Sequence, residues 1–333
     1  MKKHFIVLCT FLGIFMILFT SCQKDVDEVR LNVSDATLYI GEQLQLNADV
    51  IPSKATQDVK WSSSNTDIAT VSSSGMVTAH SKGECEIIAM ADGVKAVCRI
   101  HSGMRSFEVN GVKFNMVLVK HGFFYKGAKT SLLNTTPIIL SKDYFIGETE
   151  VTQELWESVM GENPSFHTGN KVLPVENITW DDCQIFLDKL NHMSGMNFRL
   201  PTECEWEYAA RGGNPVEPYY YSGSDNLDEV AWYKSNSDGE SHATALKKKN
   251  QLGLYDMTGN VLEWCQDMHK TGFFEHDTLT DPLCEQGDGK RILKGGGFLD
   301  SDGSQKLLSV STQFSDTPTS ACKDVGLRLV MTR

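Results

Sequence analysis

The sequence predicts a multidomain protein in which an all-β sandwich precedes an α+β domain with much irregular structure. Three observations support this prediction. Apolar and polar residues alternate between about residues 29 and 102, which is typical of half-buried strands. Helix-capping signals begin only after residue 150. The 333 residues, 41% of them hydrophobic, suffice for two packed cores.

The overall charge narrows the classes of partner. The chain carries 31 Lys and Arg against 43 Asp and Glu, a net charge of −12. Binding to nucleic acid requires a basic face that neutralises phosphates. We therefore expect no nucleic-acid partner.

The first residues resemble the signal peptide of a bacterial lipoprotein. Lys2 and Lys3 precede an apolar run from Phe5 to Phe19, and Thr20 and Ser21 lead to Cys22. The resemblance implies that residues 1–21 are cleaved and that Cys22 is lipidated. The alternative, a transmembrane anchor, is disfavoured because the run of about fifteen residues is shorter than the roughly 20 that span a bilayer.

Residues 22–28 are then predicted to form a solvated, lipidated tether. Asp25, Asp27 and Glu28 give it an acidic character, similar to the surface-export signals of some Gram-negative lipoproteins. The expected location is a bacterial membrane, either the outer membrane or the cell surface, with the lipid as the membrane contact.

Residues 29–102 are predicted to form the sandwich. Alternating runs cover 44–50 and 94–100, and Asp92-Gly93 is a hairpin-turn signal. The segments Trp61-Ser-Ser-Ser-Asn65, Ile68-Ala-Thr-Val71 and Gly75-Met-Val-Thr78 resemble the bacterial immunoglobulin-like domain, group 2. The resemblance implies a spacer or adhesive module.

Seven cysteines follow Cys22, and an exported protein can form disulfides. Their odd number leaves at least one thiol unpaired within the chain. The predicted hairpin register places Cys98 opposite Ile87 and not opposite Cys85, so we expect two buried thiols there. The pairing of the remaining cysteines stays open: Cys183, Cys204, Cys265, Cys284 and Cys322.

Residues 103–333 change in pattern to helices separated by long loops. Thr202-Glu-Cys-Glu205 is a capping box, and Gly212 ends the helix that it starts. Further helices are predicted to start at Thr179 and to run from about Thr152 to Met160. Short strands and loops rich in Gly, Asn and Asp fill the rest, which indicates an α+β domain.

Several long motifs in this region occur in a fixed order. They include Glu150-Val-Thr152, the stretch from Arg199 to Gly213, Gly253-Leu-Tyr-Asp-Met-Thr-Gly-Asn-Val-Leu-Glu-Trp264 and Lys294-Gly-Gly296. The series resembles the sulfatase-modifying-factor family, the formylglycine-generating enzymes. The resemblance implies a C-type-lectin-like fold. Within it, Trp206 and Trp264 are predicted to fill the core, and Arg199 and Arg211 to pair with neighbouring glutamates.

The resemblance also implies a structural calcium site. The family binds Ca²⁺ at the positions that match Asp256, Gly259, Val261 and Glu263. Two carboxylates and backbone carbonyls supply about half of the six to eight oxygens that Ca²⁺ takes. In the alternative interpretation, Asp256 caps a turn and Glu263 pairs with an arginine.

The copper chemistry of the family is predicted to be missing. Its oxidase activity depends on two cysteines shortly after the Gly-Gly motif, and the matching positions are Asp300 and Gln305. Monovalent copper prefers thiolates, which neither residue supplies. We therefore expect no catalytic residue and no copper. The alternative use of Asp300 and Asp302 as an acid–base pair competes with a simple turn.

The preferred hypothesis is a non-catalytic lipoprotein that binds a glycan, peptide or protein at the cell surface. The candidate groove combines aromatic and acidic residues: Tyr219, Tyr220, Tyr221, Trp232, Tyr233, Asp300, Asp302 and Gln305. The tyrosine run is equally consistent with a half-buried strand. Lectin-fold surface lipoproteins with hypervariable loops are a related possibility. The alternative function is a formylglycine-generating oxidase or another metal-dependent enzyme of the same family.

Overall fold

The computed structural model describes residues 25–333 except 54–57, 128–134, 214–218, 276 and 304–306. The predicted signal peptide, Cys22 and Gln305 lie outside the described residues. Within the described ranges, no helix is both long and apolar enough to cross a membrane.

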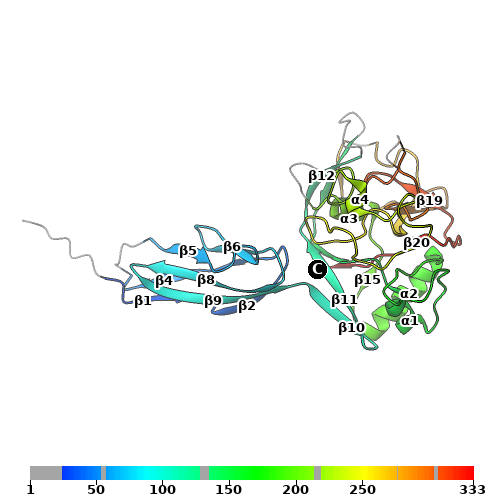
Figure 1. Cartoon of the computed structure of the whole chain (residues 1–333). Coiled ribbons are helices and arrows are strands. Elements are labelled where there is room, and N and C mark those ends of the chain that lie inside the picture. The colour runs from blue at the N-terminus through cyan, green and yellow to red at the C-terminus, as the bar shows by residue number, and fades with distance from the viewer. Residues whose placement is uncertain (1–24, 54–57, 128–134, 214–218, 276, 304–306) are drawn as a thin grey trace, which may run out of the picture.

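The N-terminal domain is built from antiparallel and parallel strands in three small sheets (Figure 1). Their orders are β2-β9-β8-β5, β3-β7-β6 and β1-β4. The strands are β1 (Glu28–Leu31), β2 (Asp35–Tyr39), β3 (Gln43–Gln45), β4 (Ala48–Ile51), β5 (Lys60–Ser63), β6 (Ala69–Val71), β7 (Met76–Ala79), β8 (Gly83–Ala91) and β9 (Val94–Gly103).

The hairpin of β8 and β9 has the predicted register. Asp92 and Gly93 form its turn with positive φ angles of 49° and 84°. Cys98 faces Ile87, so the Cys85 and Cys98 thiols are not opposite each other. Both are free and buried, which confirms that prediction.

Two details of the sandwich differ from the prediction. The alternating run 44–50 forms two strands. The first, β3, pairs with β7, whereas the second, β4, begins after Leu46 and pairs with β1. The side chain of Asn32 accepts from the Asn47 amide at 2.8 Å and so stabilises the passage from β3 to β4. The domain also starts earlier than residue 29: Val26 is buried in the sandwich, although 22–28 was predicted to be a solvated tether.

The C-terminal domain contains three further sheets. Their orders are β10-β11-β14-β21-β15, β12-β13-β17 and β19-β18-β16-β20. The strands are β10 (Arg105–Val109), β11 (Val112–Val119), β12 (Gly122–Lys126), β13 (Thr136–Leu140), β14 (Tyr144–Gly147), β15 (Phe198–Arg199), β16 (Leu262–Met268), β17 (Leu279–Thr280), β18 (Arg291–Lys294), β19 (Phe314–Asp316), β20 (Val325–Gly326) and β21 (Val330–Thr332).

The first three helices begin where the capping signals predict, and the short fourth helix was not predicted. They are α1 (Gln153–Met160), α2 (Trp180–Ser194), α3 (Glu203–Ala210) and the short α4 (Leu227–Val230). Thr179 and Thr202 each close a capping box with the third helical residue. Gly161 ends α1 in the left-handed conformation, which glycine adopts without a Cβ clash.

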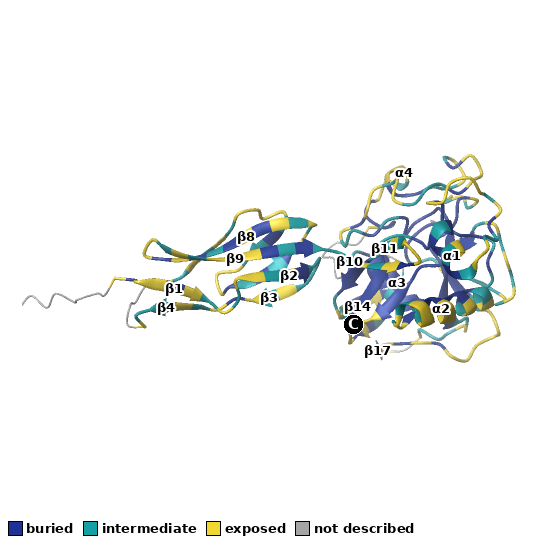
Figure 2. Ribbon diagram, turned by 90° about the horizontal axis from the view of Figure 1, so that it is seen from below, coloured by how far each residue is buried: buried dark blue, intermediate teal, exposed yellow. Residues whose placement is uncertain are grey.

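The core of the C-terminal domain surrounds α3 and the central strands, where buried residues concentrate in Figure 2. Trp206 is 0% exposed and Trp264 is 1% exposed, as predicted. Trp206 belongs to the apolar cluster around α3, whereas Trp264 belongs to the cluster that packs against α1 and α2.

The two domains are joined with almost no linker. Only Met104 separates β9 from β10, and Figure 1 shows the sandwich extending away from the C-terminal domain. Tyr39 of the sandwich meets Phe145 edge to face, with ring centroids 5.7 Å apart. The side chain of Arg333, the last residue, pairs with Glu42. The junction therefore combines apolar and ionic contacts.

Candidate functional site

The structure brings together the two chain segments that were predicted to form a groove. The Tyr221 hydroxyl donates to the Asp302 carboxylate. The Lys234 amide donates to the Asp300 carbonyl at 3.0 Å, and the Val310 amide donates to the Tyr220 carbonyl at 2.9 Å. Residues 219–236 are therefore neighbours of residues 297–303 and 307–310 on one surface, which we call the aromatic loop surface.

The members of this surface differ in how much they are exposed. Tyr219 is 39% exposed, whereas Tyr220 and Tyr233 are half-buried. Tyr221 is only 2% exposed and packs with Val230 and Leu308. The prediction that Tyr221 contacts a ligand is corrected: its ring is buried and supports the loops.

Trp232 is half-buried and held by two neighbours. Its ring stacks on His242 with centroids 3.8 Å apart, and Lys247 Nζ lies 4.0 Å from the ring centroid. Its Nε1 is buried without a hydrogen-bond partner among the described residues. Trp232 is thus a fixed aromatic element within the loops.

Asp300, which was predicted to match one of the family's copper cysteines, stabilises the glycine turn. Its carboxylate accepts from the Gly297 amide at 2.9 Å, and its own amide donates to the Gly297 carbonyl at 3.0 Å. Leu308 packs over Gly296, where an added Cβ would meet its Cδ2. Asp300 thus closes a turn over residues 297–300, directly before the Asp300–Gly303 segment that the sequence offered as a turn in place of an acid–base pair.

The loop containing the calcium motif is centred on a buried ion pair. Glu263 accepts from Arg328 at 2.7 to 3.0 Å and from Trp206 Nε1 at 2.6 Å. Arg328 is 0% exposed and also donates to two backbone carbonyls. The sequence offered, as the alternative to a calcium site, that Glu263 pairs with an arginine, and the structure contains this pair.

Asp256 and Gly259 are placed on the same loop. One Asp256 oxygen accepts from the Ala245 amide at 2.7 Å, while Oδ1 is buried with no partner among the described residues. Gly259 has φ of +78°, and a Cβ there would lie 2.3 Å from the Trp232 carbonyl. Val261 is buried beside them.

Glu150 is a member of this cluster that the sequence analysis did not single out as a site. Its carboxylate accepts from the Val261 amide at 3.1 Å and from Asn260 at 2.9 Å. Burial, with Asp256 and Glu263 nearby, raises the pKa of Glu150 well above its usual value. Its place in the Glu150-Val-Thr152 motif was the only available signal.

The cluster therefore holds three buried carboxyl groups against one guanidinium, and burial favours the protonated form of Glu150. Burial raises the pKa of Asp256 to about 6. No three His, Cys, Asp or Glu side chains within the described ranges are arranged so that they could hold a metal ion.

A second buried charge cluster lies under α3. Glu207 accepts from Arg211 at 2.7 Å and lies 3.3 Å from Lys294 Nζ, and Lys126 contacts Glu203 at 2.6 Å. Burial opposes ionisation of Glu207, but the three cations outweigh it and hold its pKa well below the usual value. Arg211 was predicted to pair with a neighbouring glutamate and does so, and Arg199 likewise pairs with Glu205. The sequence analysis did not predict the contribution of Lys126 and Lys294.

The buried Asp267 predicts that stability in calcium-free buffer falls as pH rises above about 4. Burial raises the pKa of Asp267 to about 7, while the unfolded carboxyl titrates near 4. The native state therefore binds more protons between these values, and the free energy of unfolding falls as pH rises from about 4 to 7 and levels off above that. Denaturant titrations at several pH values measure this slope. Asp267→Asn is expected to flatten it, and an unchanged slope would contradict the assignment.

These features define a class: a bacterial immunoglobulin-like sandwich fused to a lectin-like domain of the formylglycine-generating type. The model of the sulfatase-modifying factor enzyme 1-like domain matches residues 104–333, and that of the bacterial Ig-like domain (group 2) matches residues 25–99. The chain belongs to the sulfatase-modifying factor enzyme 1-like family.

Similar proteins include catalytic and inactive forms. The chain is 34% identical to Chaperone protein LppX of Paenibacillus barcinonensis, over 57% of this chain and 80% of that protein. It is 30% identical to the Formylglycine-generating enzyme of Streptomyces coelicolor, over 48% of this chain and 53% of that protein. It is also 30% identical to the Inactive C-alpha-formylglycine-generating enzyme 2 of Mus musculus, over 47% of this chain and 48% of that protein. The chain thus spans about half the length of the latter two.

A solved structure also resembles the C-terminal part. Treponema denticola variable protein 1 superposes with a TM-score of 0.62 at 31% identity. The superposition covers 69% of this chain and 99% of that protein.

Proposed function

We propose that the chain is a lipid-anchored, non-catalytic binding protein, with Cys22 as the lipidated residue. Its aromatic loop surface would bind a glycan, peptide or protein outside the cell. The observation that carries the proposal is Asp300: at a position where the family needs a copper thiolate, a carboxylate is engaged by the Gly297 amide. The likenesses to an inactive family member and to a variable protein support it.

The competing function is a formylglycine-generating oxidase. It predicts tight Cu(I) binding and conversion of a cysteine in a sulfatase peptide. Titration of purified protein with Cu(I), followed by mass spectrometry of the peptide, separates the two functions. Copper held through thiols together with peptide conversion would overturn the non-catalytic proposal.

The binding surface is tested by replacing its most exposed aromatic ring. Tyr219→Ala is expected to weaken binding to the strongest glycan or peptide on an array by about fivefold or more, because aromatic anchors dominate such interfaces. Tyr125→Ala is the matched control, since Tyr125 is 50% exposed on β12 and outside this surface. Equal loss in both variants, or no binding on any array, would contradict the proposal.

We further propose a structural calcium ion at Asp256, Gly259, Val261 and Glu263. Two observations fit such an ion: the partnerless Oδ1 of Asp256 and the excess of buried carboxylates. Since Arg328 already engages Glu263, backbone carbonyls would supply much of the coordination. The ion would neutralise the loop and take no part in chemistry.

Removal of calcium is therefore expected to lower the melting temperature of the purified protein. A ligand that binds only the native state stabilises it by mass action. Asp256→Asn should abolish the response to a chelator, whereas Asp188→Asn on the exposed face of α2 should retain it. An unchanged melting temperature in the chelator experiment would remove the calcium proposal.

A further inference from the structure

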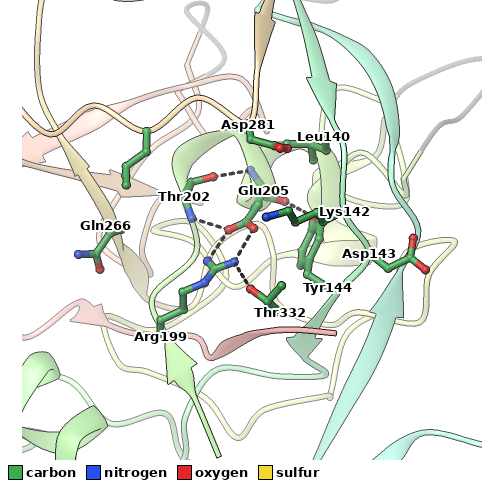
Figure 3. A pocket seen from close by; sticks show the side chains of 11 residues that line it. Leu140, Lys142, Asp143, Tyr144, Arg199, Thr202, Glu205, Gln266, Asp281 and Thr332 are labelled. Carbon is green, nitrogen blue, oxygen red and sulfur yellow. Dashed lines mark hydrogen bonds and ion pairs between the residues drawn. The ribbon is translucent and has the colours of Figure 1, made fainter.

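A small mixed cavity lies away from the aromatic loop surface, between the end of β13, the start of α3 and the C-terminal strand (Figure 3). Its volume is about 240 Å³. Leu140, Tyr144 and Leu283 supply apolar lining. Pockets for whole drug-sized ligands are usually about 300–1,000 Å³, so this one suits a single small molecule.

Three of the charged residues that line it are already neutralised. Arg199 holds Glu205 through two hydrogen bonds of 2.6 and 2.7 Å. Asp143 points away from the cavity in Figure 3 and pairs with Lys120 at 2.9 Å. These residues give the cavity a polar wall without a net charge.

Two charges of opposite sign remain at its edge. Lys142 extends toward the Arg199–Glu205 pair in Figure 3 and makes no ion pair within the described part of the chain. Asp281 accepts from the amide of Ser141 at 2.7 Å and from its hydroxyl, and among the described residues no cation forms an ion pair with it. The two side chains form no ion pair with each other in the described structure.

We propose that this cavity binds a small zwitterion with an apolar side chain, that is, a free α-amino acid. Its carboxylate would contact Lys142, and its ammonium group would contact Asp281. The side chain would pack on Leu140 and Leu283, and burial of these apolar surfaces favours binding. A ligand that bridges the two charges explains why they line one cavity without pairing.

The probe is leucine, titrated calorimetrically into the full-length protein. Two analogues each lack one charge: leucinamide has no carboxylate and 4-methylpentanoate has no ammonium group. Saturable binding of leucine, with both analogues weakened by at least about tenfold, is the expected result. Absence of leucine binding, or equal binding of either analogue, would overturn the proposal.

Two variants test the charges separately. Lys142→Met and Asp281→Asn are each expected to weaken leucine binding about two- to fivefold, the range for exposed charge contacts. Lys189→Met, an exposed lysine of α2, is the matched control. If the Asp281→Asn variant does not fold, the Lys142→Met variant alone tests the proposal. Unchanged leucine affinity in that variant would refute the assignment. Neither result depends on the aromatic loop surface.

Discussion

Replacing Arg328 with methionine is expected to destabilise the C-terminal domain by about 3–5 kcal/mol, because one partner of a buried ion pair is removed. Glu263 would keep only the Trp206 donor, and the carbonyls of Gly147 and Tyr255 would lose theirs. Burying groups without partners adds to the cost. The measurement is a urea titration that compares the free energies of unfolding.

The control for this variant is Arg99→Met on the sandwich surface. The Arg99 side chain is 72% exposed and lies 4.0 Å from Glu86, so its loss should change stability by about 0.5 kcal/mol or less. If Arg328→Met were as mild as this control, the buried ion pair would not be a main support of the domain.

Glu207→Gln is expected to cost a similar amount, about 3–5 kcal/mol. The substitution preserves shape but removes a negative charge that faces three buried cations. Lys126 and Lys294 would then keep only Glu203 as a carboxylate partner, and Arg211 would lose its ion pair. Thermal and chemical unfolding both report the loss.

A matched substitution on α1 isolates the effect of burial. Glu157→Gln changes the same chemical group at an exposed helical position and should leave stability within about 0.5 kcal/mol. A large loss in both variants would show that the glutamate charge in general, and not its burial, is responsible.

Local signals predicted the parts of the fold that local chemistry determines. The capping boxes at Thr179 and Thr202 and the helix end at Gly161 depend on residues three or four positions apart. The Asp92-Gly93 turn likewise sets the register of its own hairpin. Strand boundaries depend on pairing partners that are distant in the sequence, so the alternation over 44–50 did not predict a division into two strands.

The site was predictable only where a motif carried it. Asp256 and Glu263 came from one continuous motif, but Glu150 bonds Asn260 from 110 residues away. Arg328 reaches the Gly147 carbonyl across 181 residues. For Tyr221 the sequence left two alternatives, a groove residue or a half-buried strand, and packing against Val230 and Leu308 decides for burial.

The single residue between the two domains has a consequence for encounters with a partner. Flexible linkers let a tethered module sample many orientations, whereas β9 passes into β10 through Met104 alone. Copies held by their N-terminal ends would therefore present their outer domains at a common height and tilt. Against a flat, repetitive target, such an aligned layer gains avidity from geometry, even when each single contact is weak.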